Sequence, residues 1–137
     1  MNIRYLVDTN ILLRFLTGEP PKQAAAVKKL FARAAADEVL LDVSPVIVAE
    51  ALYTLLSFYE VERKEAAEKL LTLLRQRGVK VRDGAQVFSA LERLRSTNAG
   101  FADACLAASG ANENVSIASF DRDFDKFKDV KRFEPGV

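Results

Sequence analysis

Acidic side chains are the residues of this sequence that are best placed for chemistry, and four of them stand out: Asp8, Glu50, Asp103 and Asp121. The chain has no histidine and a single cysteine, which excludes His-based catalysis and zinc-finger sites. General acid-base chemistry near neutral pH then requires strongly shifted carboxylates or lysines, or a bound metal ion. Sites made only of oxygen ligands favour Mg²⁺ or Mn²⁺ over zinc.

Two of these acids come after short apolar runs that predict strands. Residues 3–7 precede Asp8, and residues 115–118 end shortly before Asp121. In parallel α/β sheets, sites form at the carboxyl ends of the strands, where both acids are expected. Each also has an ordinary interpretation, because a carboxylate at a helix N-terminus accepts hydrogen bonds from free backbone N–H groups. Asp103, in the first turn of a predicted helix, shares that interpretation.

Glu50 has no comparable structural explanation. It lies in the apolar stretch VIVAEALYTLL, where a buried glutamate would need a partner. The alternative to a functional role is a buried ion pair with an arginine such as Arg14. If the four carboxylates converge, their mutual repulsion calls for a positive charge among them. The set therefore predicts a divalent metal site that keeps positions for water or phosphate oxygens.

The rest of the sequence predicts the elements that would hold these acids. Strands are expected at residues 3–7, 39–43, 79–81, 115–118 and, at an edge, 131–133. Helices are expected at residues 11–16, 22–36, 46–59, 63–75, 85–95, 101–111 and 123–128. Short apolar strands that alternate with helices indicate an α/β fold, a short parallel sheet flanked by helices on both faces. No linker or repeat interrupts the pattern, so we expect a single domain over residues 1–137.

Charge and hydropathy exclude several classes of function. The chain carries 20 basic and 19 acidic residues, so a nucleic-acid surface would have to be local. Arg14 and Arg122 are the first candidates for such contacts, because they follow the first and fourth acids. No apolar run reaches the roughly 20 residues that cross a bilayer, and we expect a cytoplasmic protein with no membrane contact. The lack of a glycine-rich phosphate loop excludes P-loop and dinucleotide sites.

The segments VDTNILLRFL, GFADACLAASGA and SFDRDF, with the lone Glu50 between the first two, resemble the PIN domain. The resemblance is closest to the VapC toxins of bacterial and archaeal toxin-antitoxin pairs and spans nearly the whole chain. It implies a Mg²⁺- or Mn²⁺-dependent endoribonuclease on a parallel-sheet core. In order along the chain, the matches to the family's four acids are Asp8, Glu50, Asp103 and Asp121.

The same resemblance implies roles for the neighbours of these acids. Asn10 would orient ligands by hydrogen bonding, Ser119 matches a hydroxyl position before the fourth acid, and Asp123 is a candidate outer ligand. A homodimer and a small antitoxin that covers the acidic groove are also implied. A housekeeping RNA-processing nuclease and a non-catalytic RNA- or protein-binding module with the same fold remain as alternatives. A receiver or phosphatase fold ranks below them. Such folds resemble one another in an Asp-Asp or Asp-x-Asp-x-Thr motif, whereas in this sequence Thr9 and Asn10 follow Asp8.

One predicted helix carries more large apolar side chains than a single helix face usually buries. These side chains are Leu52, Tyr53, Leu55, Leu56, Phe58 and Tyr59. Some of them are therefore expected to face a partner. The alternative is that all six enter the core, as occurs in helices that are buried on both sides.

Overall fold

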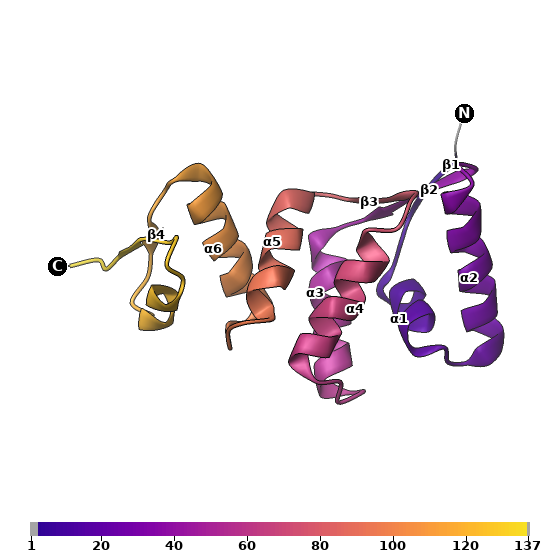
Figure 1. Ribbon diagram of the computed structural model, residues 1–137, viewed down its shortest axis with the longest axis horizontal. Helices are drawn as coiled ribbons and strands as arrows, with labels where there is room; N and C mark the ends of the chain where they lie inside the picture. Colours follow the sequence, from indigo (N-terminus) through magenta and orange to yellow (C-terminus); the bar gives the residue numbers. More distant parts are fainter. Residues whose placement is uncertain (1–2, 137) are drawn as a thin grey trace. The chain divides into compact units, whose positions relative to one another are not determined.

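The computed structural model describes residues 3–136 and divides the chain into two compact units (Figure 1). The first unit ends at Gly84 and the second begins at Ala85. Each unit has its own parallel sheet and its own helices, so the predicted α/β class is confirmed. The single domain over residues 1–137 stays a prediction. Within the described residues, no helix is long and apolar enough to cross a membrane.

The first unit is built on a three-stranded parallel sheet in the order β1-β2-β3. The expected strands at 39–43 and 79–81 are found at those residues. The strands are β1 (Ile3–Leu6), β2 (Val39–Val43) and β3 (Val79–Val81), and the helices are α1 (Thr9–Thr17), α2 (Pro21–Ala35), α3 (Pro45–Ser57) and α4 (Arg63–Leu74).

The helices of this unit begin and end where the sequence carries the appropriate signals. Ser44 is the N-cap residue of α3, and Pro45 takes the first helical position, where its missing N–H costs nothing. Gly18 ends α1 in the left-handed conformation, with its N–H donating to the carbonyl of Arg14. Because such residues start and end the helices sharply, the loops that join helices to strands can be short.

Aliphatic side chains hold the first unit together. Helix α1 packs against α2 and α3, and α3 packs against α4. The rings of Phe15 and Phe31 join α1 to α2, with their centroids 4.5 Å apart. Side chains such as Leu12, Leu41 and Leu55 are almost fully buried, each contributing about 1.5–3 kcal/mol by leaving water. Because this packing fixes both β1 and α1, it also fixes Asp8 at their junction.

Gly78 makes the close approach between the start of β3 and the end of α2 possible. Its φ is +86°, a left-handed conformation, and a Cβ atom there would lie 2.3 Å from the carbonyl oxygen of Ala34. The obstructing atoms include backbone, which cannot turn aside as a flexible side chain can. Only glycine suits this position, because the backbone is left-handed there and no room exists for a Cβ atom.

We expect Gly78→Ala to lower the free energy of unfolding by about 2 kcal/mol or more, because conformational strain and a backbone clash add. Gly18→Ala is the matched control: φ there is +74°, but nothing lies within 4 Å of the added Cβ. That variant should lose only about 1 kcal/mol, the left-handed penalty alone. Urea unfolding of both proteins measures the difference, and equal losses would contradict the close approach.

A buried acid lies on the central strand of this sheet. Asp42, only 3% exposed, accepts hydrogen bonds from Arg4 Nε at 2.8 Å and from Arg82 Nε at 3.2 Å. Burial raises the pKa of Asp42, but hydrogen bonds from the two arginines outweigh it and hold the net pKa below its usual value. Since Arg4 belongs to β1 and Arg82 follows β3, this charged group links all three strands.

The second unit combines helices with a two-stranded parallel sheet. Helix α5 begins at the last residue of the first unit. The core of the second unit is formed by Ala107, Ile117, Phe124 and Phe127. Its elements are α5 (Gly84–Leu94), α6 (Phe101–Glu113), β4 (Ile117–Ala118), the 3-10 helix η1 (Arg122–Lys126) and β5 (Arg132–Phe133).

The bounds of α5 and β5 lie within one residue of the expected ones, whereas β4, α6 and the last short helix differ more. The strand expected at 115–118 is shorter, because the N–H of Val115 donates to the carbonyl of Gly110 and is held to the end of α6. Helix α6 correspondingly runs on to Glu113 and ends at Asn114 in the left-handed conformation. The last short helix has 3-10 geometry over 122–126. The parallel strands fall into two sheets, one in each unit.

Candidate active site

A small pocket in the second unit brings three of the sequence-predicted acids together. The volume of this pocket is about 60 Å³, and it lies at the start of α6 and the turn that follows β4. Its walls are formed by Asn98, Ala99, Gly100, Asp103, Asp121, Asp123, Phe124 and Phe127. We refer to this as the acidic pocket. Three of these wall residues are carboxylates, and the rings of Phe124 and Phe127 are buried.

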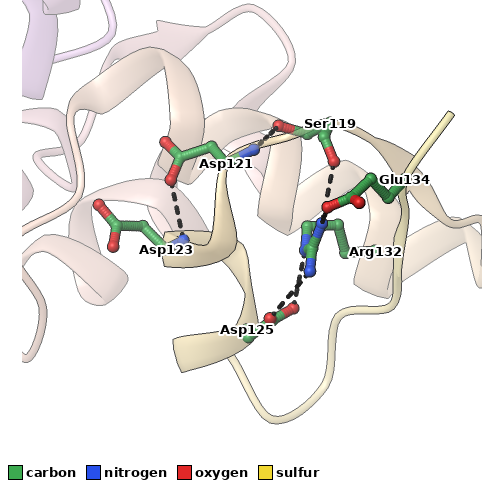
Figure 2. A network of polar contacts seen from close by, with 6 residues as sticks. All are labelled: Ser119, Asp121, Asp123, Asp125, Arg132 and Glu134. Atoms are coloured by element: carbon green, nitrogen blue, oxygen red, sulfur yellow. Dashed lines mark hydrogen bonds and ion pairs between the residues drawn. The ribbon is translucent and has the colours of Figure 1, made fainter.

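Asp121 is held by two hydrogen bonds, one at its backbone N–H and one at its side-chain carboxylate (Figure 2). Its backbone N–H donates to Ser119 Oγ at 2.9 Å, and its Oδ1 accepts the N–H of Asp123 at 2.9 Å. Figure 2 shows the carboxylates of Asp121 and Asp123 projecting to the same side of the turn. The cap interpretation of Asp121 is therefore correct for η1, and it occupies one of the two carboxylate oxygens.

Asp103 lies in the first turn of α6, three residues after the N-cap residue Gly100. A carboxylate at this end of a helix is stabilised by the helix dipole. Unlike Asp121, Asp103 accepts no hydrogen bond from residues 3–136, so both of its oxygens remain available. The small side chains of FADACLAASGA allow α6 to approach β4 closely, since a Cβ on Gly110 would lie 2.8 Å from Ile117 Cδ1.

In the first unit, Asp8 occupies the junction between β1 and α1. Its Oδ1 accepts the N–H of Ile11 at 3.2 Å, so Asp8 caps α1 and retains its second oxygen. Asn10 is exposed on the first turn. Thr9 is only 7% exposed, and its hydroxyl finds no hydrogen-bond partner among the residues that the structure describes. A buried polar group without a partner is rare in folded proteins and often marks a functional region.

The unpartnered hydroxyl makes a prediction about Thr9. Thr9→Val should raise the free energy of unfolding by about 1 kcal/mol, because it removes an unsatisfied polar group without changing the shape. Thr17→Val, at the other end of α1, is the control: the Thr17 hydroxyl donates to the carbonyl of Leu13 at 2.8 Å. Losing that bond should cost about 1 kcal/mol. Thermal melts that show two equal losses would refute an unsatisfied Thr9.

Glu50 is exposed on α3, so the alternative of a buried ion pair with Arg14 is wrong. Arg14 instead donates from Nε to Gln23 Oε1 at 2.8 Å. The apolar sequence around Glu50 is misleading because it covers two faces of the helix. Glu50 lies on the stripe that carries the exposed side chains of Val46 and Tyr53, each one turn away.

The candidate RNA contacts differ in their surroundings. Arg122 is exposed on η1. The pKa of Asp125 lies below its usual value, mainly because of the hydrogen bond from Arg132, and the positive charge of Arg122 lowers it further. Arg14 donates to the neutral side chain of Gln23 rather than to a carboxylate. Residues 75–82 include four basic and no acidic residues, and two of the four are paired, Arg77 with Asp37 and Arg82 with Asp42. Those two arginines serve the fold.

The sequence profile of the PIN domain matches residues 5–130. The chain belongs to the PIN domain family. PIN domains are generally nucleases, and the matched segment contains all four sequence-predicted acids together with Asp123. The resemblance noted from the sequence is thereby confirmed at the level of the family.

One solved structure similar to this PIN domain is a chain in the crystal structure of VapBC2 from Rickettsia felis bound to a DNA fragment from their promoter. The two chains are 17% identical, with a TM-score of 0.39, over 96% of this chain and 98% of that chain. No protein with a curated description matches this PIN domain.

The donor atoms of this PIN domain fit a hard divalent cation. Within residues 3–136, no three acids already stand close enough to hold a metal ion by themselves. Three carboxylates nevertheless line the acidic pocket, and of these Asp123 pairs with Lys126 at 3.4 Å. Asp103 and Asp121 form no ion pair with the described residues. A pocket with oxygen donors and uncompensated charge suits Mg²⁺ or Mn²⁺, which retain water ligands.

The sequence did not predict two ion-pair networks of this PIN domain, one around Asp42 and one around Arg132. The single acid within the apolar strand VLLDV was a signal for the first, because a charge there must be paired. The second surrounds Arg132, which binds Asp125, Glu134 and the carbonyl of Ser119. Nothing in the local sequence of Arg132 distinguishes it from a solvated surface arginine.

Proposed function

We propose that this PIN domain is a Mg²⁺- or Mn²⁺-dependent endoribonuclease and the toxin of a toxin-antitoxin pair. The observation that carries the proposal is the acidic pocket: Asp103, Asp121 and Asp123 line one small cavity in a chain that has no histidine. Membership of the PIN domain family supports nuclease chemistry. The sequence resemblance to VapC toxins supports RNA as the substrate and the toxin role.

In this proposal the four acids Asp8, Glu50, Asp103 and Asp121 act together as ligands, with Asp123 as an outer ligand. Capping hydrogen bonds leave one oxygen free on Asp8 and on Asp121, and these bonds restrict the rotation of each carboxylate. Asn10 and Ser119 orient the ligands. A bound divalent ion supplies an activated water, neutralises charge on the phosphate and stabilises the leaving oxygen.

Substrate binding would use local rather than global charge. Arg14 and Arg122 are the residues that we propose for contact with RNA phosphates, because they follow the first and fourth acids in the sequence. Each phosphate contact would release counterions, so RNA binding should weaken as the salt concentration rises. Cytoplasmic location belongs to the same proposal, because that is where RNA targets of a toxin are found.

A homodimer and a small antitoxin complete the proposal. Tyr53 of α3 and Phe58, the residue that follows the helix, are 71% and 75% exposed, whereas Leu52 and Leu55 are buried. The alternative that all six large apolar side chains of this region enter the core is therefore wrong. Exposed aromatic side chains are enriched where proteins bind one another, which supports a partner at this helix. The proposed antitoxin covers the acidic groove and thereby blocks substrate.

The test combines purified protein with expression in cells. Cleavage of RNA should stop with a chelator and return with Mg²⁺ or Mn²⁺, and induction without an antitoxin should arrest growth and leave discrete RNA ends. Co-expression of the neighbouring reading frame should relieve the arrest. A protein that cleaves RNA but is harmless when expressed alone would instead be a housekeeping nuclease. Binding to RNA without any metal-dependent cleavage would show a non-catalytic module.

A further inference from the structure

Arg132 of β5 is the centre of a polar network that lies next to the acidic pocket in the second unit (Figure 2). Its side chain is 15% exposed. The guanidinium forms a fork with Asp125, from Nε to Oδ1 at 3.0 Å and from Nη2 to Oδ2 at 3.2 Å. Nη1 donates to Glu134 Oε1 at 3.0 Å and to the carbonyl of Ser119 at 3.1 Å. All three nitrogens of the guanidinium are therefore engaged.

This arrangement is unsuited to binding RNA. Two carboxylates surround one guanidinium, so the group as a whole is negative and repels phosphate. The fork also fixes the plane of the guanidinium, because two parallel N–H bonds to one carboxylate leave little rotation. Arg132 is thus held rigidly, and Nη1, outside the fork, donates to the carbonyl of Ser119 and to Glu134.

Ser119 is hydrogen-bonded both to β5 and to Asp121. The Ser119 N–H donates to the carbonyl of Phe133 at 2.9 Å, and the Ser119 carbonyl accepts from Arg132. Both sides of the Ser119 backbone are therefore bound to β5. Its side-chain oxygen, Oγ, accepts the N–H of Asp121 at 2.9 Å. Every polar group of Ser119 has a defined partner, which places the next turn precisely.

The turn that follows β4 orients the proposed ligands Asp121 and Asp123. Asp121 Oδ1 accepts the N–H of Asp123, and Figure 2 shows both carboxylates on the side of the turn that faces away from Arg132. Arg132 touches neither carboxylate. It acts on them indirectly, through the main chain of Ser119 on one side of the turn and through Asp125 of η1 on the other.

We infer that Arg132 is a positioning residue, which fixes the turn from Ser119 to Asp123 and so aims the Asp121 carboxylate at the divalent ion. This inference rests on the proposed function for its consequence, though not for its geometry. Outer-shell groups that hold metal ligands in place typically contribute about 10- to 100-fold in metal affinity or activity. Lysine cannot replace arginine here, because it carries charge without the planar fork.

The experiment uses the full-length protein with Arg132→Lys and, as a matched control, Arg93→Lys. Arg93 belongs to the same unit, is also 15% exposed, and forms a comparable fork with Asp129 at 2.6 and 2.9 Å. It makes no contact with Ser119 or Asp121 in the described residues. A general loss of stability should therefore be similar in the two variants. Only Arg132→Lys should in addition loosen the turn from Ser119 to Asp123.

Two readouts follow the turn. Amide hydrogen exchange at Asp121 and Asp123 should become about tenfold faster in Arg132→Lys, because the bonds that protect those amides lose their support. Mn²⁺ affinity should fall by about 10- to 100-fold, and cleavage should recover when the Mn²⁺ concentration is raised to saturation. Arg93→Lys should leave both unchanged. If Arg132→Lys fails to fold, Asp125→Asn weakens the same fork and should shift both readouts in the same direction.

Unchanged exchange at Asp121 and Asp123, or an equal change in Arg93→Lys, would overturn the positioning role. Failure of the proposed function looks different: wild-type protein would then neither bind Mn²⁺ nor cleave RNA. Amide exchange would still decide whether Arg132 holds the turn, since that readout needs neither metal nor substrate.

Discussion

Asp103→Asn should reduce metal-dependent RNA cleavage by about two to three orders of magnitude, since the metal contributes several kcal/mol of transition-state stabilisation and each 1.36 kcal/mol is a factor of ten. Asparagine keeps the shape of the side chain but removes the charge. Asp103 accepts no hydrogen bond from residues 3–136 and lines the acidic pocket together with two other acids. Removing its charge relieves repulsion, so the melting temperature of the metal-free protein should hold or rise.

Asp129→Asn is the matched control for that variant. Asp129 belongs to the same unit but is paired with Arg93, whose hydrogen bond keeps the pKa of Asp129 below its usual value, and it does not line the acidic pocket. It should retain cleavage and lose some stability, the opposite of Asp103→Asn. Full cleavage by Asp103→Asn at physiological Mg²⁺ would defeat the assignment.

Asp42→Asn should have the largest effect on stability, a loss of about 3 kcal/mol in the free energy of unfolding. The change removes charge-assisted hydrogen bonds from Arg4 and Arg82 and turns an amide donor toward one of them. The loss is at the lower end for a buried pair because both arginines are about half exposed and can regain water. Asp37→Asn, which breaks an exposed pair with Arg77, should lose far less.

The same acid predicts a dependence on pH. Because the folded pKa of Asp42 is depressed below its usual 3.8, its contribution is present at pH values above 3.8 and is lost as the pH falls through the lower, folded pKa. Wild type and Asp42→Asn should therefore differ most near neutrality and converge in acid. Urea unfolding at a series of pH values measures this, and a constant difference down to the lowest pH would contradict it.

Much of the secondary structure was predictable because it depends on local signals. Val39–Val43 is an apolar run bounded by polar residues, and Pro45 and Gly18 sit where helices start and stop. The start of β4 was harder to predict, because the hydrogen bond from Val115 to Gly110 shortens the strand, and no residue type in the local sequence signals that bond.

The candidate site was predictable in its acids and not in its supports. Asp121 and Asp123 stand in one short motif, and Asp103 lies on the helix before them, so their shared pocket follows from short connections. Glu50 shows the limit of this reasoning, because an apolar sequence does not reveal which face of a helix is packed. Arg4 and Asp42 are 38 residues apart, and pairs at such separations need the fold to be known first.

Mn²⁺ binding in the absence of RNA measures directly whether these carboxylates form a divalent-metal site. Water-proton relaxation reports Mn²⁺ bound to protein and is insensitive to traces of contaminating nuclease. Wild-type protein should bind Mn²⁺, and a variant with Asp103→Asn and Asp121→Asn together should lose that binding while remaining folded. Equal binding by the two proteins, or none by wild type, would contradict the claim.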